Sequence, residues 1–103
     1  MINWEQMDAR EIINLVKACN SWNNGAGSLL NGIELKILDA SVGVQNGIAI
    51  EPGIITVANN AFLVRCINRG LLSINFFNIN NTYIPARHAH AYGLKTGQKF
   101  MNI

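Results

Sequence analysis

Apolar residues near the start of the chain recur at the spacing of one helix face. The residues that share this face are Ile12, Leu15, Val16 and Cys19. They follow the i, i+3, i+4, i+7 pattern that is typical of an amphipathic helix. Asp8 and Glu11 stand three residues apart at its start, as in a capping box. We therefore predict a helix over residues 8–19, followed by a turn over residues 20–27, where asparagine and glycine gather.

An alternating pattern replaces the helical one after this turn. The Asn31-Gly32 pair is a strong signal for a two-residue hairpin turn. From residue 33 to 37 apolar and polar residues alternate, as in a strand with one buried face. The alternation changes parity near Leu38-Asp39, which indicates a β-bulge. The pattern thus predicts a hairpin over residues 28–42.

Three more strand-like runs follow, each rich in β-branched or aromatic residues. They are residues 54–58, 61–67 and 71–77, separated by turn formers at 59–60 and 68–70. With the first hairpin they make about five strands, and closure into a barrel is the usual way in which such a set protects its edges. The expected fold is mainly β with short helices, a small antiparallel barrel preceded by one helix.

The last part of the chain combines a short helix with an extended end. Asn80-Asn81 is expected to form a loop, Pro85 to start a helix over residues 86–92, and Gly93 to end it. The segment LKTGQKF then returns to an extended conformation. The whole chain, residues 1–103, fits one domain, with the barrel over about residues 26–103.

The composition is that of a folded chain without a membrane segment. Half of the residues are hydrophobic and 14% are charged, which excludes a disordered chain. No apolar run reaches the ~18–20 residues of a membrane span, and the first residues lack a secretory signal, so a cytoplasmic location is the expectation. Cys19 and Cys66 lie far apart and are expected to be small buried hydrophobes, not a disulfide framework.

We expect no catalytic, metal or cofactor site in this chain alone. The glycines of residues 25–32 follow a helix and precede a strand, which is the reverse of the order in a phosphate-binding loop. His88 and His90 are two residues apart, which on a helix points them to different faces and disfavours a shared metal. Six acidic residues and two histidines, spread over so small a domain, also argue against a self-contained catalytic set.

Basic residues with aromatic neighbours are the remaining functional signal. Six cations fall on or beside strands and in the tail, where Tyr83, Tyr92 and Phe100 also lie; they are Lys36, Arg65, Arg69, Arg87, Lys95 and Lys99. Alternation directs Lys36 and Arg65 outward, and with Arg69 they share one face if their strands are neighbours. These cations are candidate phosphate contacts of a nucleic acid. The alternative is that they are solvated outward positions, as the net charge of only +2 suggests.

Several strings along the chain, in their order, resemble a known family. They are NSW after the first helix, LKILDAS, EPGIITV, LLSI and YGLKTGQKF. Together they resemble the C-terminal domain of methionyl-tRNA formyltransferase and its relatives, over roughly residues 2–100. The resemblance implies an open Greek-key barrel similar to an OB-fold, which agrees with the strand pattern. It also implies structural roles for Gly32, Pro52 and Gly53 at turns, and for Trp22 as a plug between helix and barrel.

The resemblance leaves two alternatives for function. In the tRNA enzyme this domain contacts tRNA, whereas a separate N-terminal Rossmann-like domain binds formyl-folate and carries the catalytic residues. The chain is thus expected to be a non-catalytic accessory domain, excised or standing alone, with such an N-terminal domain and tRNA or another acceptor as partners. The second alternative is a module for packing or homodimerisation, as in sugar- or folate-type relatives, without nucleic-acid binding.

Overall fold

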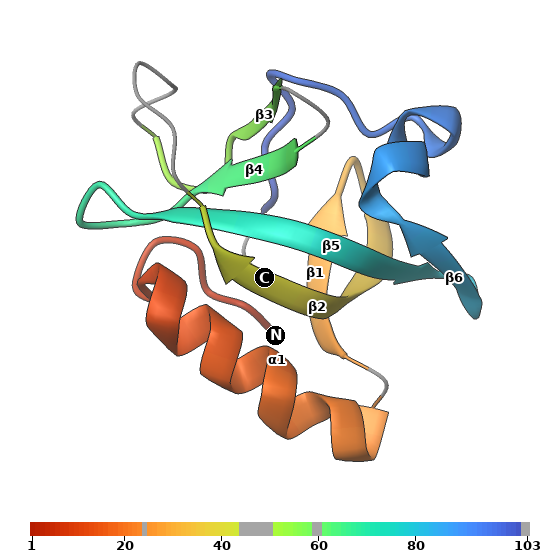
Figure 1. The fold of residues 1–103 in the computed structure, drawn as a ribbon, viewed down its shortest axis with the longest axis horizontal. Coiled ribbons are helices and arrows are strands. Elements are labelled where there is room, and N and C mark those ends of the chain that lie inside the picture. Colours follow the sequence, from red (N-terminus) through yellow and green to blue (C-terminus); the bar gives the residue numbers. More distant parts are fainter. Residues whose placement is uncertain (24, 44–50, 59–60, 102–103) are drawn as a thin grey trace.

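A computed structural model describes residues 1–23, 25–43, 51–58 and 61–101 of the chain, with residues 21–23 described for their backbone alone. The elements in chain order are α1 (Ala9–Asn23), β1 (Ala26–Leu30), β2 (Ile33–Val42), β3 (Ile55–Ala58), β4 (Ala61–Arg65), β5 (Leu71–Ile79), β6 (Thr82–Pro85) and the 3₁₀ helix η1 (Ala86–Tyr92) (Figure 1). The prediction of a mainly β fold with an N-terminal helix is confirmed.

Helix α1 begins with the expected capping box. The backbone N–H of Glu11 donates to Asp8 Oδ1 at 2.8 Å, and the N–H of Asp8 donates to Glu11 Oε1 at 3.1 Å. The helix then continues through Asn23, so the expected end at residue 19 was wrong. The added turn is fastened to the sheet, because Asn20 Nδ2 donates to the carbonyl of Leu38 at 2.7 Å.

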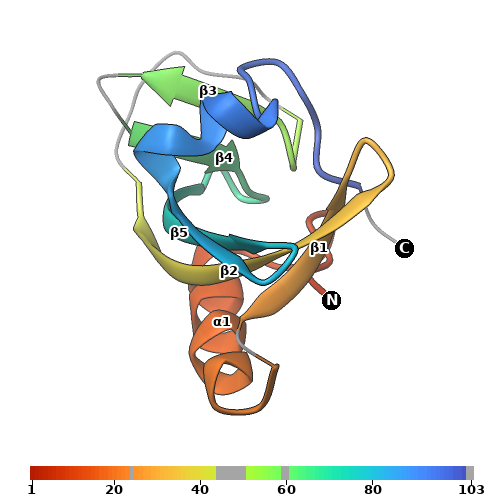
Figure 2. The same ribbon diagram turned by 90° about the vertical axis from the view of Figure 1, so that its right-hand side faces the viewer.

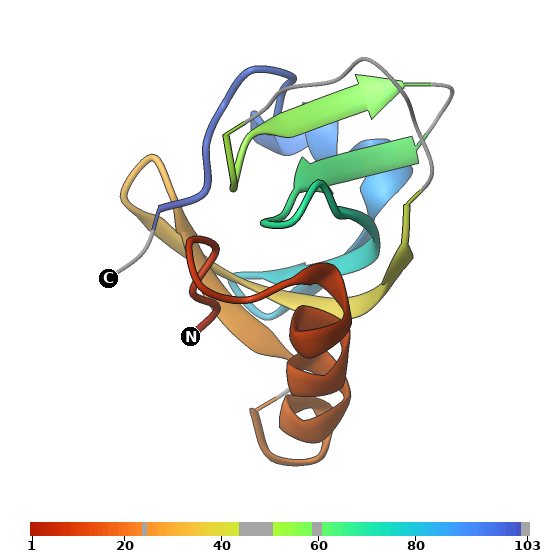
Figure 3. The same ribbon diagram turned by 90° about the vertical axis from the view of Figure 1, so that its left-hand side faces the viewer.

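The strands form one antiparallel sheet in the order β1-β2-β5-β4-β3, with β6 also paired to β5. Strand β5 pairs along one edge with β2 and along the other edge first with β4 and then with β6. The sheet curls, so that β3 and β4 lie over the layer of β1, β2 and β5. Helix α1 covers the opposite side of this layer (Figures 2 and 3).

Two-residue turns connect β1 to β2 and β5 to β6. Asn31 and Gly32 have φ of 52° and 78°, and Asn80 and Asn81 have φ of 52° and 64°. Positive φ at both central residues is typical of the type I′ turn that matches strand twist. The first hairpin was predicted. The second was expected to be a loop, and β6 was missed because it is only four residues long and ends in proline.

A pair of bulges lets β2 and β5 change parity together. Ile37 pairs with Phe77 and Asp39 with Phe76, so Leu38 is the extra residue of β2; Ala40 then pairs with Ile74, so β5 in turn has an extra residue. The predicted bulge near Leu38-Asp39 is therefore confirmed. Its partner on β5 restores the pairing of interior-facing residues, so that Ile37 and Phe77 on one side of the two bulges and Ala40 and Ile74 on the other all face the core.

The C-terminal segment, residues 97–101, completes the curl. The N–H of Met101 donates to the carbonyl of Leu29 in β1 at 2.9 Å, and the N–H of Ile55 in β3 donates to the carbonyl of Gln98 at 2.9 Å. Single bridges, Leu29–Met101 and Ile54–Lys99, join the two sheet edges to this segment. The strand ladder itself stays open, and the extended end of the chain fills the gap.

Trp4 lies at this closure. It is 1% exposed, its Nε1 donates to Ser28 Oγ at 2.9 Å, and its ring stacks on Phe100 with centroids 5.2 Å apart. Trp4 therefore joins the N-terminal segment to β1 and to the C-terminal segment. The side chain of Trp22, for which a junction role was expected, lies outside the described residues, as do the expected turn at 59–60 and residues 44–50 of the loop before Pro52.

Candidate nucleic-acid interface

The candidate cations are spread over the fold. Strand β5 lies between β2 and β4, so these two strands are not neighbours. Lys36 pairs with Asn78 near one end of β5, whereas Arg65 pairs with Leu71 at its other end. At ~3.3 Å per residue these ends are on the order of 20 Å apart. The condition under which Lys36, Arg65 and Arg69 would share one face is therefore not met.

Arg65 and Arg69 lie at the end of the sheet where α1 begins. Arg69 is exposed in the predicted turn after β4, with φ of 61°. The pKa of the Cys66 thiol is raised to about 12, first by burial and then by the nearby Asp8 carboxylate, while Arg65 opposes the rise. Asp8 and Arg65 thus act on the same thiol, and the carboxylate reduces the positive potential that Arg65 offers to a phosphate.

Lys95 and Lys99 belong to the turn and segment that follow η1. Lys99 Nζ pairs with Glu51 Oε2 at 3.3 Å. Because both side chains are well exposed, this ion pair is worth only ~0–1 kcal/mol. Lys95 is exposed, and its N–H donates to Gln98 Oε1 at 2.8 Å, which shapes the turn.

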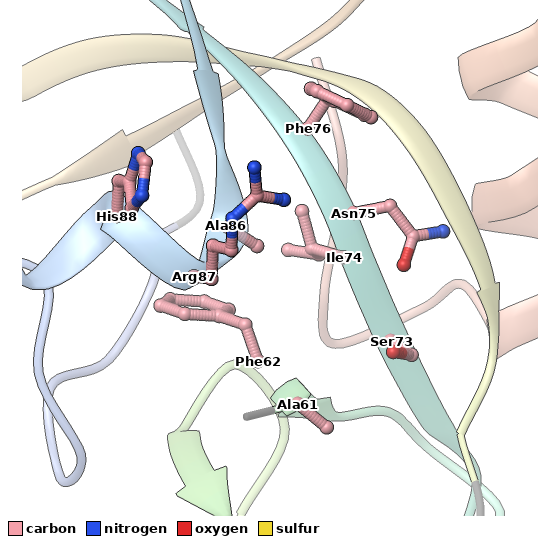
Figure 4. A pocket seen from close by; sticks show the side chains of 9 residues that line it. All are labelled: Ala61, Phe62, Ser73, Ile74, Asn75, Phe76, Ala86, Arg87 and His88. Atoms are coloured by element: carbon pink, nitrogen blue, oxygen red, sulfur yellow. The ribbon is translucent and has the colours of Figure 1, made fainter. Parts of the chain in front are cut away.

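Arg87 lines an open pocket where β4, β5 and η1 meet. We call it the Arg87 pocket; its volume is about 540 Å³, and its lining is Ala61, Phe62, Ser73, Ile74, Asn75, Phe76, Ala86, Arg87 and His88. In Figure 4 the guanidinium of Arg87 points toward β5, between Ile74 and Phe76, whereas His88 lies on the other side of η1. His90 lines an adjoining hollow that adds Val57 and shares Ala61, Phe62, Ala86 and Arg87 with this pocket. The two histidines therefore lie at neighbouring hollows.

One exposed aromatic side chain lines this pocket, and a second lies on the neighbouring strand. Phe76 is 43% exposed and lines the pocket, and Tyr83 on the neighbouring strand β6 is 64% exposed. Phe76 pairs with Pro85 and Asn78 pairs with Tyr83. Phe76 and Tyr83 are therefore diagonal neighbours on one side of the sheet, a relation that places Cα atoms ~7–8 Å apart.

A cross-strand row continues this surface to β2. Lys36, Asn78 and Tyr83 pair in turn across β2, β5 and β6. Their sequence neighbours Leu35 and Phe77 are buried on the interior side, so alternation places the row on the other side of the sheet. Within the row only Tyr83 is well exposed, since Lys36 is half-buried and Asn78 is 6% exposed. We call the set Lys36, Phe76, Asn78, Tyr83 and Arg87 the β5–β6 face. It brings together two of the predicted cations and two exposed aromatic rings.

Carboxylates also lie at this face. Asp39 pairs with Phe76 across the two strands and accepts a hydrogen bond from Asn75 Nδ2 at 2.9 Å. Glu34 lines a hollow together with Lys36. The β5–β6 face is therefore mixed in charge, not a basic patch.

Phe76 and Asn78 are the residues of this face that the sequence pattern did not indicate. The run 71–77 is apolar at most positions and was interpreted as one core strand. The bulge in β5, next to Asn75, turns Phe76 outward and Phe77 inward. A bulge in β5 was not expected, because this run has no regular alternation of apolar and polar residues whose change of parity would indicate a bulge. Tyr83 was noted only as an aromatic neighbour of Arg87.

The described ranges contain neither a helix that could span a membrane nor a cluster of metal ligands. Within residues 1–23, 25–43, 51–58 and 61–101, no helix has the length and apolar character needed to span a membrane. In the same part of the chain, no three His, Cys, Asp or Glu side chains gather closely enough to bind one metal ion.

Comparison with known families agrees with the fold. The model of the family described as "Formyl transferase, C-terminal domain" matches residues 1–81, which span α1 and β1 to β5. Lys36 and Phe76 fall inside the match, whereas Tyr83, Arg87 and the C-terminal segment lie beyond it. No curated protein matches the chain in sequence. Because the family match covers well over half of the chain, the chain belongs to the family of formyl transferase C-terminal domains.

Proposed function

We propose that this accessory domain contacts the acceptor of a formyltransferase, a nucleic acid such as tRNA, through the β5–β6 face. The observation that carries the proposal is the pair of exposed rings, Phe76 and Tyr83, between the cations Lys36 and Arg87. Aromatic rings stack on bases and cations neutralise phosphates, which is the usual combination in proteins that bind nucleic acid without base-specific contacts. Arg65, Arg69, Lys95 and Lys99 would then be peripheral contacts.

The catalytic work belongs to another domain in this proposal. An N-terminal Rossmann-like domain would bind formyl-folate and transfer the formyl group in the cytoplasm, while this domain holds the acceptor. The chain alone should then have no formyltransferase activity. An assay with formyl-folate and an acceptor tests this expectation. Turnover above the buffer background that is lost on changing His88 or His90 would contradict it.

The salt dependence of tRNA binding tests the acceptor contact. Each phosphate neutralised on a duplex contributes about −0.9 to the slope of log K against log salt. For two phosphate contacts we expect a slope of about −1.4 on unpaired RNA to about −1.8 on a duplex for the natural chain, and a clearly shallower slope for the double variant Lys36→Gln/Arg87→Gln, in which only the peripheral cations remain. The matched control is Arg10→Gln/Lys17→Gln on the exposed side of α1, which should keep affinity and slope. Failure of the natural chain to bind tRNA, or equal losses in both variants, would refute the proposal.

A second candidate function, packing or homodimerisation, is favoured by an apolar hollow beside the β1–β2 and β5–β6 turns, at the same end of β5 as Lys36 and Asn78. Ile33 and Tyr92 are 55% and 51% exposed beside a hollow of about 180 Å³ with the buried residues Leu30, Leu35, Ile79 and Leu94 in its lining. Analytical ultracentrifugation decides this alternative. A dimer at micromolar concentration that dissociates on Ile33→Asp, in a chain that does not bind tRNA, would favour it.

A further inference from the structure

We infer that the β5–β6 face takes an unpaired stretch of RNA, not a duplex, and holds it mainly by stacking bases on Phe76 and Tyr83. The inference rests on the proposed function and specifies which part of the acceptor is contacted. In a duplex, the faces of each base are covered by its neighbours. Only unpaired bases can leave the stack and lie on protein rings.

The positions of the two rings suit a single strand. Both side chains project from the outer side of adjacent antiparallel strands, and Tyr83 is the more exposed at 64%. Asn78 pairs directly with Tyr83 and is 6% exposed, so its side chain lies beneath the surface that the two rings form. Two rings at this diagonal spacing can receive two bases of one strand, since side chains of this size reach across it.

The Arg87 pocket extends this surface inward. Its volume of about 540 Å³ falls within the ~300–1,000 Å³ of pockets that hold small ligands. Phe62 and Ile74 give it an apolar side, and Ser73 and Asn75 give it polar groups. The Arg87 guanidinium, which points toward β5 (Figure 4), can bind a phosphate with two parallel hydrogen bonds. One nucleotide of the strand would enter here, beside Phe76.

The charges around the face argue against a phosphate-driven mode. Asp39 and Glu34 accompany Lys36 and Arg87, so the local charge is nearly balanced. A duplex bound without base contacts depends on many phosphate contacts, and this face offers two cations. A single strand that makes two phosphate contacts should give a shallow salt slope of about −1.4, at ~0.7 per phosphate.

The test compares single-stranded with paired RNA. A fluorescent seven-nucleotide RNA, alone or annealed to its complement, is titrated with the full chain and followed by anisotropy. We expect the single strand to bind at least about tenfold more tightly. Phe76→Ala and Tyr83→Ala should each weaken it at least about fivefold, as expected for the loss of one stacked base. The matched control is Tyr92→Ala, which removes another exposed tyrosine. Tyr92 lines the apolar hollow that contains Ile33, which we call the Ile33 hollow.

The outcomes separate the inference from the proposed function. Equal affinity for single strand and duplex, or an equal loss in Tyr92→Ala and Tyr83→Ala, would overturn the inference. If tRNA still binds in that case, the proposed function stands. If neither RNA nor tRNA binds, both fail. Circular dichroism melts verify that each variant is folded, and Phe76→Leu, which keeps an apolar side chain but no ring, replaces Phe76→Ala if the latter does not fold.

Discussion

The two cysteines differ in their surroundings. Cys66 is 1% exposed after β4, and its Sγ lies 3.7 Å from the carbonyl of Val64. Cys19 on α1 is only partly buried against the core. The prediction of two buried hydrophobes is thus confirmed for Cys66 and holds in part for Cys19. Burial, the largest cause, raises the pKa of the Cys66 thiol to about 12, so this thiol keeps its proton near neutral pH.

Thiol chemistry should therefore separate the two cysteines. At pH 8 we expect an aromatic disulfide reagent to label Cys19 in the folded chain and Cys66 only after unfolding in urea, because the thiolate is the reactive form. Between about pH 9 and 12 the unfolded chain releases the Cys66 proton while the folded chain retains it, so the free energy of unfolding should fall as pH rises. In Cys66→Ala the free energy of unfolding should not show this part of its decrease with pH. Equal labelling rates would contradict the account.

Features of single elements that depend on neighbouring residues could be predicted from the sequence. The capping box, the Asn31-Gly32 hairpin and the bulge near Leu38 depend on neighbouring residues, and each was predictable. The sheet order is different, because it depends on which distant strands meet. No pattern in the sequence indicated that β5 separates β2 from β4, and so the supposed three-cation face was misplaced. The Arg87 pocket likewise needs three elements to meet.

Two of the predicted turn glycines, Gly32 and Gly53, have similar backbone conformations but differ in how closely other atoms approach them. Both have positive φ, 78° at Gly32 and 89° at Gly53. A Cβ on Gly32 would meet no atom within 4 Å, whereas a Cβ on Gly53 would lie 2.7 Å from the carbonyl oxygen of Phe100. Gly32→Ala should cost about 1–2 kcal/mol from backbone strain. Gly53→Ala should cost clearly more in urea unfolding, and equal costs would show that the C-terminal segment does not lie against Gly53.

At the scale of the whole molecule, the N-terminal and C-terminal segments both bind to β1. The N–H of Ile2 donates to the carbonyl of Gly27, and the N–H of Met101 donates to the carbonyl of Leu29, each at 2.9 Å. The stacked rings of Trp4 and Phe100 lie at the same place. This closure covers the outer edge of β1 and could not be predicted, because it joins residues from opposite ends of the sequence.

A double-mutant cycle tests this closure. Trp4→Ala and Phe100→Ala should each lower the free energy of unfolding by about 3–5 kcal/mol, as expected for large buried aromatic side chains. The interaction energy from the cycle should be about 0.5–1.5 kcal/mol, the typical worth of an aromatic pair. Tyr83→Ala, the exposed control, should change stability by no more than ~0.5 kcal/mol. Strict additivity of the two core variants would mean that the rings do not interact.

The central claim, that this family member contacts its acceptor through the β5–β6 face, is tested most directly by amide NMR of the full chain with and without tRNA. We predict shift changes concentrated at residues 74–78 and 82–88, with little change at the Arg69 turn and around Ile33 and Tyr92. Changes confined to the Arg69 turn or to the Ile33 hollow, or no changes at saturating tRNA, would contradict the claim.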